Sequence, residues 1–140
     1  MFFGCTGLTT APELPATTLA EGSYQFMFYV CTNLVNAPVL PATTLASSCY
    51  IGMFQGCTSL TTAPELPATT LANNCYQQMF YDCTNLNYIK CLATDISASN
   101  CLSNWVYNVA STGTFVKNSA ATWNVTGLNG IPTGWTVVNE

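Results

Sequence analysis

The sequence predicts an α/β repeat protein: a solenoid of about four coils, with short parallel strands and short helices, closed by a C-terminal cap. The four methionines, Met1, Met27, Met53 and Met79, are spaced by 26 residues, and nearly the same sequence follows each of the first three. A repeat of about 20 to 50 residues is typical of solenoids and propellers. Only 6% of the residues are charged, which fits columns of identical side chains stacked at short range.

The repeat divides the chain into two predicted parts. Residues 1–104 form four 26-residue rows, although the fourth row departs from the pattern after Leu86. Residues 105–140 form a C-terminal capping segment that contains all three tryptophans, Trp105, Trp123 and Trp135. Large rings can close the open end of a stack; an exposed platform for carbohydrate is the alternative.

One half of each row predicts a short helix. Leu71, Cys75, Met79 and Cys83 recur every four residues, which indicates a helical apolar stripe. Gly56 follows the equivalent stripe of the previous row and fits the left-handed position after a helix. In the other rows this position holds Gly4, Asp82, which tolerates the conformation, and Val30, which fits it poorly.

The other half of the row predicts a short strand near Leu60–Ala63, because threonine favours extended structure and Pro64 must end or edge a strand. Equivalent strands would stack in parallel at about 4.8 Å.

The rows resemble the BspA-like leucine-rich repeats of bacterial surface proteins. The residues that carry the resemblance are Cys57, Leu60, Leu66, Pro67, Leu71, Cys75, Tyr76, Met79, Phe80 and Cys83, with their copies in the other rows. The sequence from Ser111 to Glu140, which includes Gly-Ile-Pro-Thr-Gly-Trp, is similar to the end cap of such proteins. The resemblance implies a leucine-rich-repeat solenoid at the bacterial cell surface or outside the cell. Its implied use is recognition or adhesion, with a protein or glycan ligand on a host or matrix.

The resemblance also implies a binding face on the exposed side of the strand arm. The candidate binding residues are Thr9, Thr10, Val35, Asn36, Thr61, Thr62, Asn87 and Tyr88. They are small and uncharged, apart from the aromatic Tyr88, so they offer few of the anchors that dominate binding energy. A solvated sheet face is an equally good interpretation of each of them.

Composition argues against several other functions. Two lysines and no arginine or histidine cannot neutralise a phosphate backbone, so we expect no nucleic-acid partner. We expect no metal site and no cofactor, because histidine and C-x-x-C pairs are absent. No apolar run is long enough to insert in a membrane. A glycosidase pair of Glu13 and Glu65 is the best enzymatic alternative, but Val39 interrupts their column, and we expect no enzyme.

The eight cysteines have two interpretations. Seven fall in two columns: Cys5, Cys31, Cys57 and Cys83 in one, and Cys49, Cys75 and Cys101 in the other, while Cys91 lies outside both. Neighbouring rungs could approach within disulfide range. Buried free cysteines would serve equally well as small apolar side chains.

The first row has no cap of its own, so it would expose Leu8, Leu14 and Leu19. Either further rows precede it, or the open end associates head to tail with another molecule. The sequence therefore predicts a non-enzymatic extracellular recognition or adhesion module. The alternative is a structural spacer, or a self-stacking subunit of a fibre, stalk or phage tail appendage.

Overall fold

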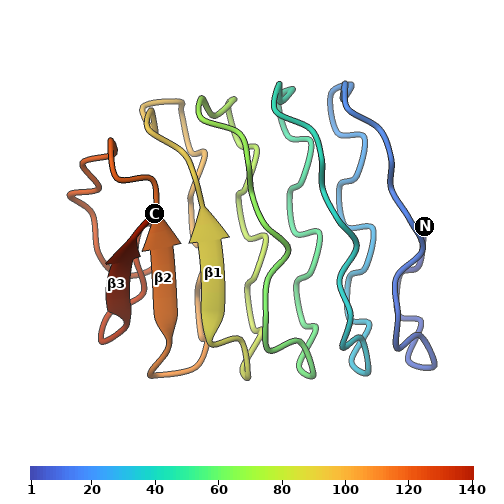
Figure 1. Ribbon diagram of the computed structural model, residues 1–140. Coiled ribbons are helices and arrows are strands. Elements are labelled where there is room, and N and C mark those ends of the chain that lie inside the picture. The colour runs from blue at the N-terminus through green and yellow to red at the C-terminus, as the bar shows by residue number, and fades with distance from the viewer.

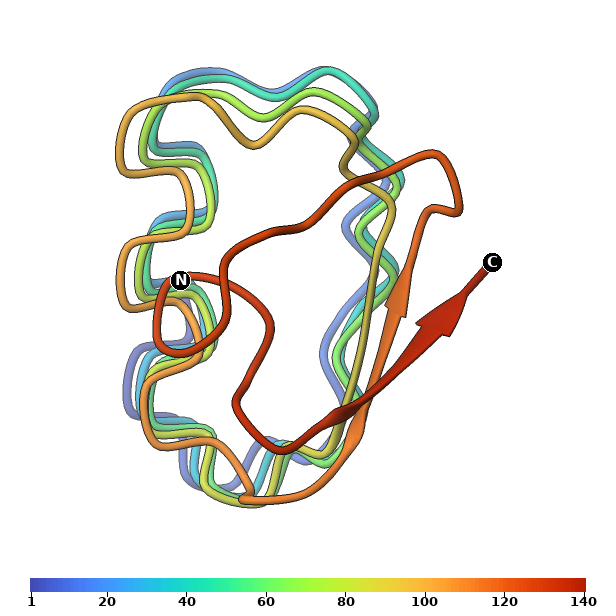
Figure 2. The same ribbon diagram turned by 90° about the vertical axis from the view of Figure 1, so that its left-hand side faces the viewer.

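The chain winds into a stack of coils, one for each 26-residue row. The computed structural model describes residues 1–140. Figure 1 shows the coils side by side from the N-terminal to the C-terminal end, and Figure 2 shows successive coils lying over one another. Each coil has two arms. The strand arm carries the β-structure, and the turn arm (residues 1–5, 20–31, 46–57, 72–83 and 98–109) is a series of tight turns.

The structure contains three strands, all at the C-terminal end of the stack: β1 (Tyr88–Cys91), β2 (Thr114–Lys117) and β3 (Thr136–Asn139). They form one parallel sheet in the order β1-β2-β3 (Figure 1). Tyr88 is in register with Thr114, and Thr114 with Thr136. The sheet therefore joins the fourth coil to the capping segment.

The strand predicted near Leu60–Ala63 is wrong, as are its equivalents in the first two rows. On this arm isolated parallel bridges join the first coil to the second, as at Thr10 and Asn36, and the third coil to the fourth, as at Thr62 and Tyr88. Pro12, Pro38 and Pro64 stand two residues after Thr10, Asn36 and Thr62, and proline has no N–H to donate to a ladder. The fourth row has no proline, so β1 can form there.

The register of the strand arm slips by one residue in the fourth coil. Leu66 pairs with Cys91 and Thr70 with Asp95, an offset of 25 residues, whereas Thr62 and Tyr88 pair at the usual offset of 26. The slip lies between Tyr88 and Cys91, in the part of the fourth row that departs from the repeat. It also makes Lys90 the neighbour of Glu65 in the adjacent coil.

The predicted fold class, an α/β solenoid with short helices, is wrong because the structure contains no helix. On the turn arm every fourth residue has a positive φ, which an α-helix cannot accommodate. In the third coil these residues are Asn74, Gln78 and Asp82, with φ of 59°, 54° and 59°. A four-residue apolar spacing is shared by a helix and by this run of turns, so the stripe alone could not distinguish them.

Hydrogen bonding explains why the turns replace the helix. Along the turn arm, alternate amides bond within their own coil and to the next coil. The Met27 N–H donates to Tyr24 O at 3.2 Å, whereas the Tyr24 N–H donates to Cys49 O at 2.9 Å. A helix would direct all these donors into itself, and the coils would lose half of the bonds that hold the arm together.

The left-handed position predicted at Gly4 and Gly56 is confirmed, with φ of 66° and 77°. Asp82 adopts it with φ of 59°, and so does the β-branched Val30, with φ of 57°. Each of these residues ends a tight turn rather than a helix. The backbone of Val30 is strained, because a β-branched residue rarely adopts a positive φ.

Identical side chains form ladders in the core. Phe2, Phe28, Phe54 and Phe80 stack with ring centroids 5.5 to 5.8 Å apart and nearly parallel planes. Leu34, Leu60 and Leu86 are fully buried in a second ladder. The buried residues include no polar or charged side chain, so apolar contact between coils dominates the packing.

The three tryptophans pack at the C-terminal end of the stack. The Trp105 ring is fully buried and lies 6.0 Å from Tyr76 and 6.1 Å from Trp123, centroid to centroid. The indole N–H groups of Trp105, Trp123 and Trp135 donate to Gly130 O, Ala93 O and Ala110 O. In Figure 2 the segment after β2 crosses the end of the stack.

Candidate functional site

The structure brings four of the eight predicted binding residues into one column of the strand arm. Thr10 is bridged to Asn36, and Thr62 to Tyr88. The Asn36 side-chain amide also donates to the Thr10 hydroxyl at 3.1 Å. The column continues through the register of the sheet to Thr114 and Thr136. Sequence reasoning missed these two, because they lie beyond the regular repeat.

The other four residues, Thr9, Val35, Thr61 and Asn87, form the adjacent column. Their side chains are exposed, and Val35 exposes 51% of its surface. The Thr9 carbonyl accepts the Asn36 N–H, and the Thr61 carbonyl accepts the Asn87 N–H. We call these two columns together the strand face. It is a regular, uncharged surface, and backbone hydrogen bonds on it join the first coil to the second and the third coil to the fourth.

The strand face has no hollow of its own. None of the four cavities in the molecule is lined by any of its eight residues. Tyr88, its only large aromatic residue, is half-buried in β1. The face could therefore bind an extended or flat partner, but it could not enclose a small molecule.

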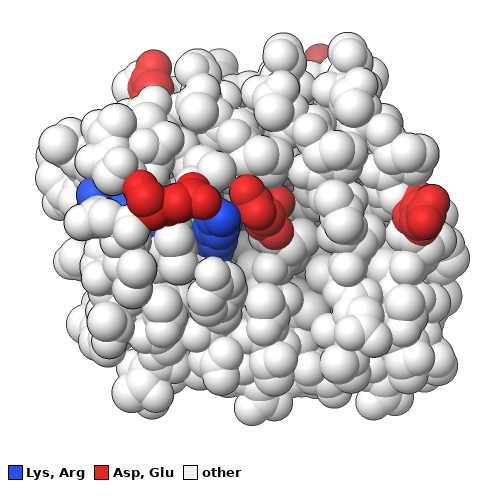
Figure 3. Space-filling model, in the orientation of Figure 1, with Lys and Arg blue, Asp and Glu red and all other residues white.

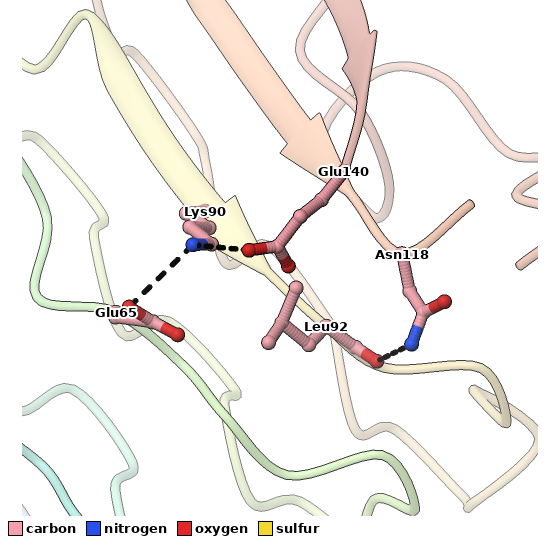
Figure 4. Close-up of polar contacts among 5 residues, drawn as sticks. All are labelled: Glu65, Lys90, Leu92, Asn118 and Glu140. Atoms are coloured by element: carbon pink, nitrogen blue, oxygen red, sulfur yellow. Dashed lines mark hydrogen bonds and ion pairs between the residues drawn. The ribbon is translucent and has the colours of Figure 1, made fainter. Parts of the chain in front are cut away.

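A charged cluster borders the strand face at the level of β1. The Lys90 ammonium lies 2.7 Å from a Glu140 carboxylate oxygen and 3.7 Å from one of Glu65 (Figure 4). The hydrogen bond that Lys90 donates to the Glu140 carboxylate raises the pKa of Lys90. Figure 3 shows that most of this side of the molecule is free of charged groups. These two ion pairs connect the third coil, through Glu65, and the C-terminal residue, Glu140, to Lys90 in β1.

The two glutamates considered as a catalytic pair have separate environments. Glu65 is paired with Lys90. Glu13 lines a groove of about 360 Å³ formed by the first two coils. The groove is lined mainly by alanine and proline, with the exposed Val39 at its surface. The two carboxylates do not share a cavity.

All eight cysteines are free thiols, so the ladders are not cross-linked. Burial raises the pKa of Cys57 and of Cys91 to about 12 and that of Cys49 to about 11. The thiolate is the nucleophilic and metal-binding form, so these buried thiols are poorly suited to either role. No group of three or more histidine, cysteine, aspartate or glutamate residues is arranged to hold a metal ion.

The chain matches no protein-family model, and no curated protein and no solved structure matches it. No helix in the structure is long and apolar enough to cross a membrane. The strand face and the stack of coils are therefore the features from which a function can be inferred.

Proposed function

We propose that the chain is a non-enzymatic recognition or adhesion module that binds a protein or glycan through the strand face. The observation that carries the proposal is the column of Thr10, Asn36, Thr62 and Tyr88, in which bridges join Thr10 to Asn36 and Thr62 to Tyr88. A pre-organised, uncharged surface loses little entropy when it meets a partner. The resemblance to BspA-like repeats supports an extracellular or cell-surface location.

The chemistry of the face favours partners that offer repeated hydrogen-bonding groups. Threonine hydroxyls and asparagine amides both donate and accept hydrogen bonds, and they recur here at the spacing of the coils, about 4.8 Å. An extended polysaccharide or an extended peptide presents such groups in a row. The scarcity of large side chains predicts affinity through many weak contacts rather than through one anchor.

A screen of immobilised glycans and matrix proteins tests the proposal. The affinity for each ligand found is then measured with the Thr62→Arg variant, which adds a long charged side chain in the middle of the strand face. Thr43→Arg is the matched control, because Thr43 is also an exposed threonine but lies outside this face. We expect Thr62→Arg to weaken binding at least tenfold and Thr43→Arg to leave it unchanged. Equal effects of the two variants would show that the ligand lies elsewhere.

A structural spacer or self-stacking subunit of a fibre, stalk or phage tail appendage is a second candidate. The first three rows are nearly identical, and ladders such as Phe2–Phe28–Phe54–Phe80 pass through successive coils. Repetition of this kind suits a rigid rod, whereas a recognition surface usually varies from row to row. Light scattering and electron microscopy distinguish the two. Filaments that appear with rising concentration would favour the spacer.

A further inference from the structure

The N-terminal face of the first coil carries the same ladders as the coil interfaces, but nothing packs on it. Phe28 and Leu34 of the second coil are fully buried, whereas Phe2 and Leu8, their equivalents in the first coil, are only half-buried. Phe3 exposes 60% of its surface at this end. The face is therefore a continuation of an interface that the molecule already uses several times.

Backbone-to-backbone hydrogen bonds between coils on the turn arm all run in one direction. The amide of an earlier coil donates to the carbonyl of the next, as in Phe28 N–H to Met53 O at 2.9 Å and Phe54 N–H to Met79 O at 3.0 Å. The turn-arm amides of the first coil that point out of the coil therefore all donate to carbonyls of the second coil. Five of its turn-arm carbonyls accept no hydrogen bond within the chain: those of Met1, Phe3, Glu21, Ser23 and Gln25. Their equivalents in the second coil all accept one: those of Met27, Tyr29, Ser47, Cys49 and Ile51.

This polarity restricts what can cover the face. Two N-terminal faces placed against each other would oppose carbonyl to carbonyl along the turn arm. The C-terminal face of a second copy is occupied by its own cap. There Leu128 O and Asn129 Oδ1 accept the amides of Val106 and Asn104. A partner must instead offer amide donors at the spacing of the turn arm, together with phenylalanine and leucine rungs.

We propose that the N-terminal face is a docking surface for one further coil of this same 26-residue repeat. The sequence of residues 53–78 has the required chemistry. Within the structure its amides at Phe54, Gly56, Asn74, Tyr76 and Gln78 all donate to the following coil. In the docked position these five amides meet the carbonyls of Met1, Phe3, Glu21, Ser23 and Gln25. The inference depends on the stack alone and not on the proposed function of the strand face.

The test joins a synthetic row with the sequence of residues 53–78 directly to Met1 of the full chain. We expect the thermal midpoint to rise by several degrees, since the new coil buries the exposed ladders. We also expect the five amides of the added row to exchange with solvent at least about tenfold more slowly than in the free peptide. A midpoint that does not rise, or amides that exchange as in the free peptide, would overturn the proposal.

Two synthetic variants of the added row separate hydrogen bonding from apolar contact. N-methylation at the positions of Tyr76 and Gln78 removes two of the proposed donors, and we expect it to abolish most of the stabilisation. N-methylation at the positions of Ser59 and Glu65 is the control, because neither amide donates a hydrogen bond in the structure. Equal effects of both variants would contradict the donor–acceptor match. A dimer of the unmodified chain that Phe3→Arg abolishes would place a second copy on the face, and would also overturn the proposal.

Discussion

The thiol of Cys57 donates a hydrogen bond of 3.2 Å to the carbonyl oxygen of Phe28 in the preceding coil. The same contact recurs from Cys31 to Phe2 at 2.8 Å and from Cys83 to Phe54 at 3.0 Å. Each of these carbonyls also accepts the backbone N–H of the cysteine in its own coil. The cysteine column therefore connects the coils without a disulfide, and its small apolar side chain fills the space beside the aromatic ladder.

This contact predicts that Cys57→Ala lowers the free energy of unfolding by about 1–3 kcal/mol, through the cavity and the lost hydrogen bond. Chemical denaturation measures the change. Cys5→Ala is the control, because Cys5 is only half-buried at the end of the column, and its effect should be smaller. An equal loss at both positions would contradict the role of the contact.

Gly52 and Phe26 predict a second effect. Gly52 has φ of 55°, and a Cβ added there would overlap the ring of Phe26 in the preceding coil. Gly52→Ala should therefore cost about 2 kcal/mol or more, from backbone strain and overpacking together. Gly4→Ala shares the positive φ of 66° but meets no atom, so it should cost only about 1 kcal/mol. If the added Phe26→Ala does not recover part of the Gly52→Ala loss, the ring is not the obstacle.

Val30 predicts a stabilising substitution. Its φ of 57° places a β-branched side chain in the left-handed region, where the other rows have Gly4, Gly56, Asp82 and Asn108. Val30→Gly should raise the free energy of unfolding by about 1 kcal/mol, because the strain disappears. Thermal denaturation measures the gain. A destabilised variant would mean that the Val30 side chain contributes more through packing than it costs through strain.

An interrupted aromatic column on the turn arm predicts a second stabilising change. Phe3 stacks on Tyr29 at 4.6 Å and Tyr81 on Tyr107 at 4.4 Å, and Gln55 occupies the rung between these pairs. Gln55→Tyr would complete the column and should stabilise the fold by about 0.5–1.5 kcal/mol. Gln25→Tyr adds the same ring where the neighbouring rung is Ile51, and it should give less. The two variants are compared by chemical denaturation.

The raised pKa values of the buried thiols predict that the protein loses stability in alkali. Burial raises the pKa of Cys57 from its ordinary 9.0 to about 12, and that of Cys49 to about 11. Above pH 9 the unfolded chain releases these protons while the folded chain retains them, so stability should fall between pH 9 and pH 12. Below pH 9 the thiols make no contribution to the pH dependence. Denaturation at a series of pH values measures the slope, and Cys57→Val should make it shallower.

Several features could be predicted from particular residues. The spacing of the methionines predicted the coils, and Gly4 and Gly56 identified the left-handed positions correctly. The helix was predicted wrongly because Leu71, Cys75, Met79 and Cys83 show only the spacing of buried residues. They do not show where the backbone amides find their acceptors. The sheet was missed because Thr114 and Thr136 lie outside the repeat, where periodicity carries no information.

The candidate site also has a part that the sequence could predict and a part that it could not. The strand-arm residues were found as variable positions next to the predicted strand, and the structure pairs Thr10 with Asn36 and Thr62 with Tyr88 across neighbouring coils. The Lys90 cluster could not be foreseen. It depends on the one-residue slip that sets Lys90 beside Glu65, and on β3 bringing Glu140 to the same place.

The sequence by itself determined the length of each coil, the residues that form the ladders and the near absence of charge. A 26-residue repeat sets equal side chains over one another, and apolar burial then selects which of them turn inward. Only the tertiary structure decided the path of the backbone. On the turn arm the choice between a helix and a run of turns depends on whether alternate amides bond within the coil or to its neighbour. That neighbour exists only once the chain has stacked.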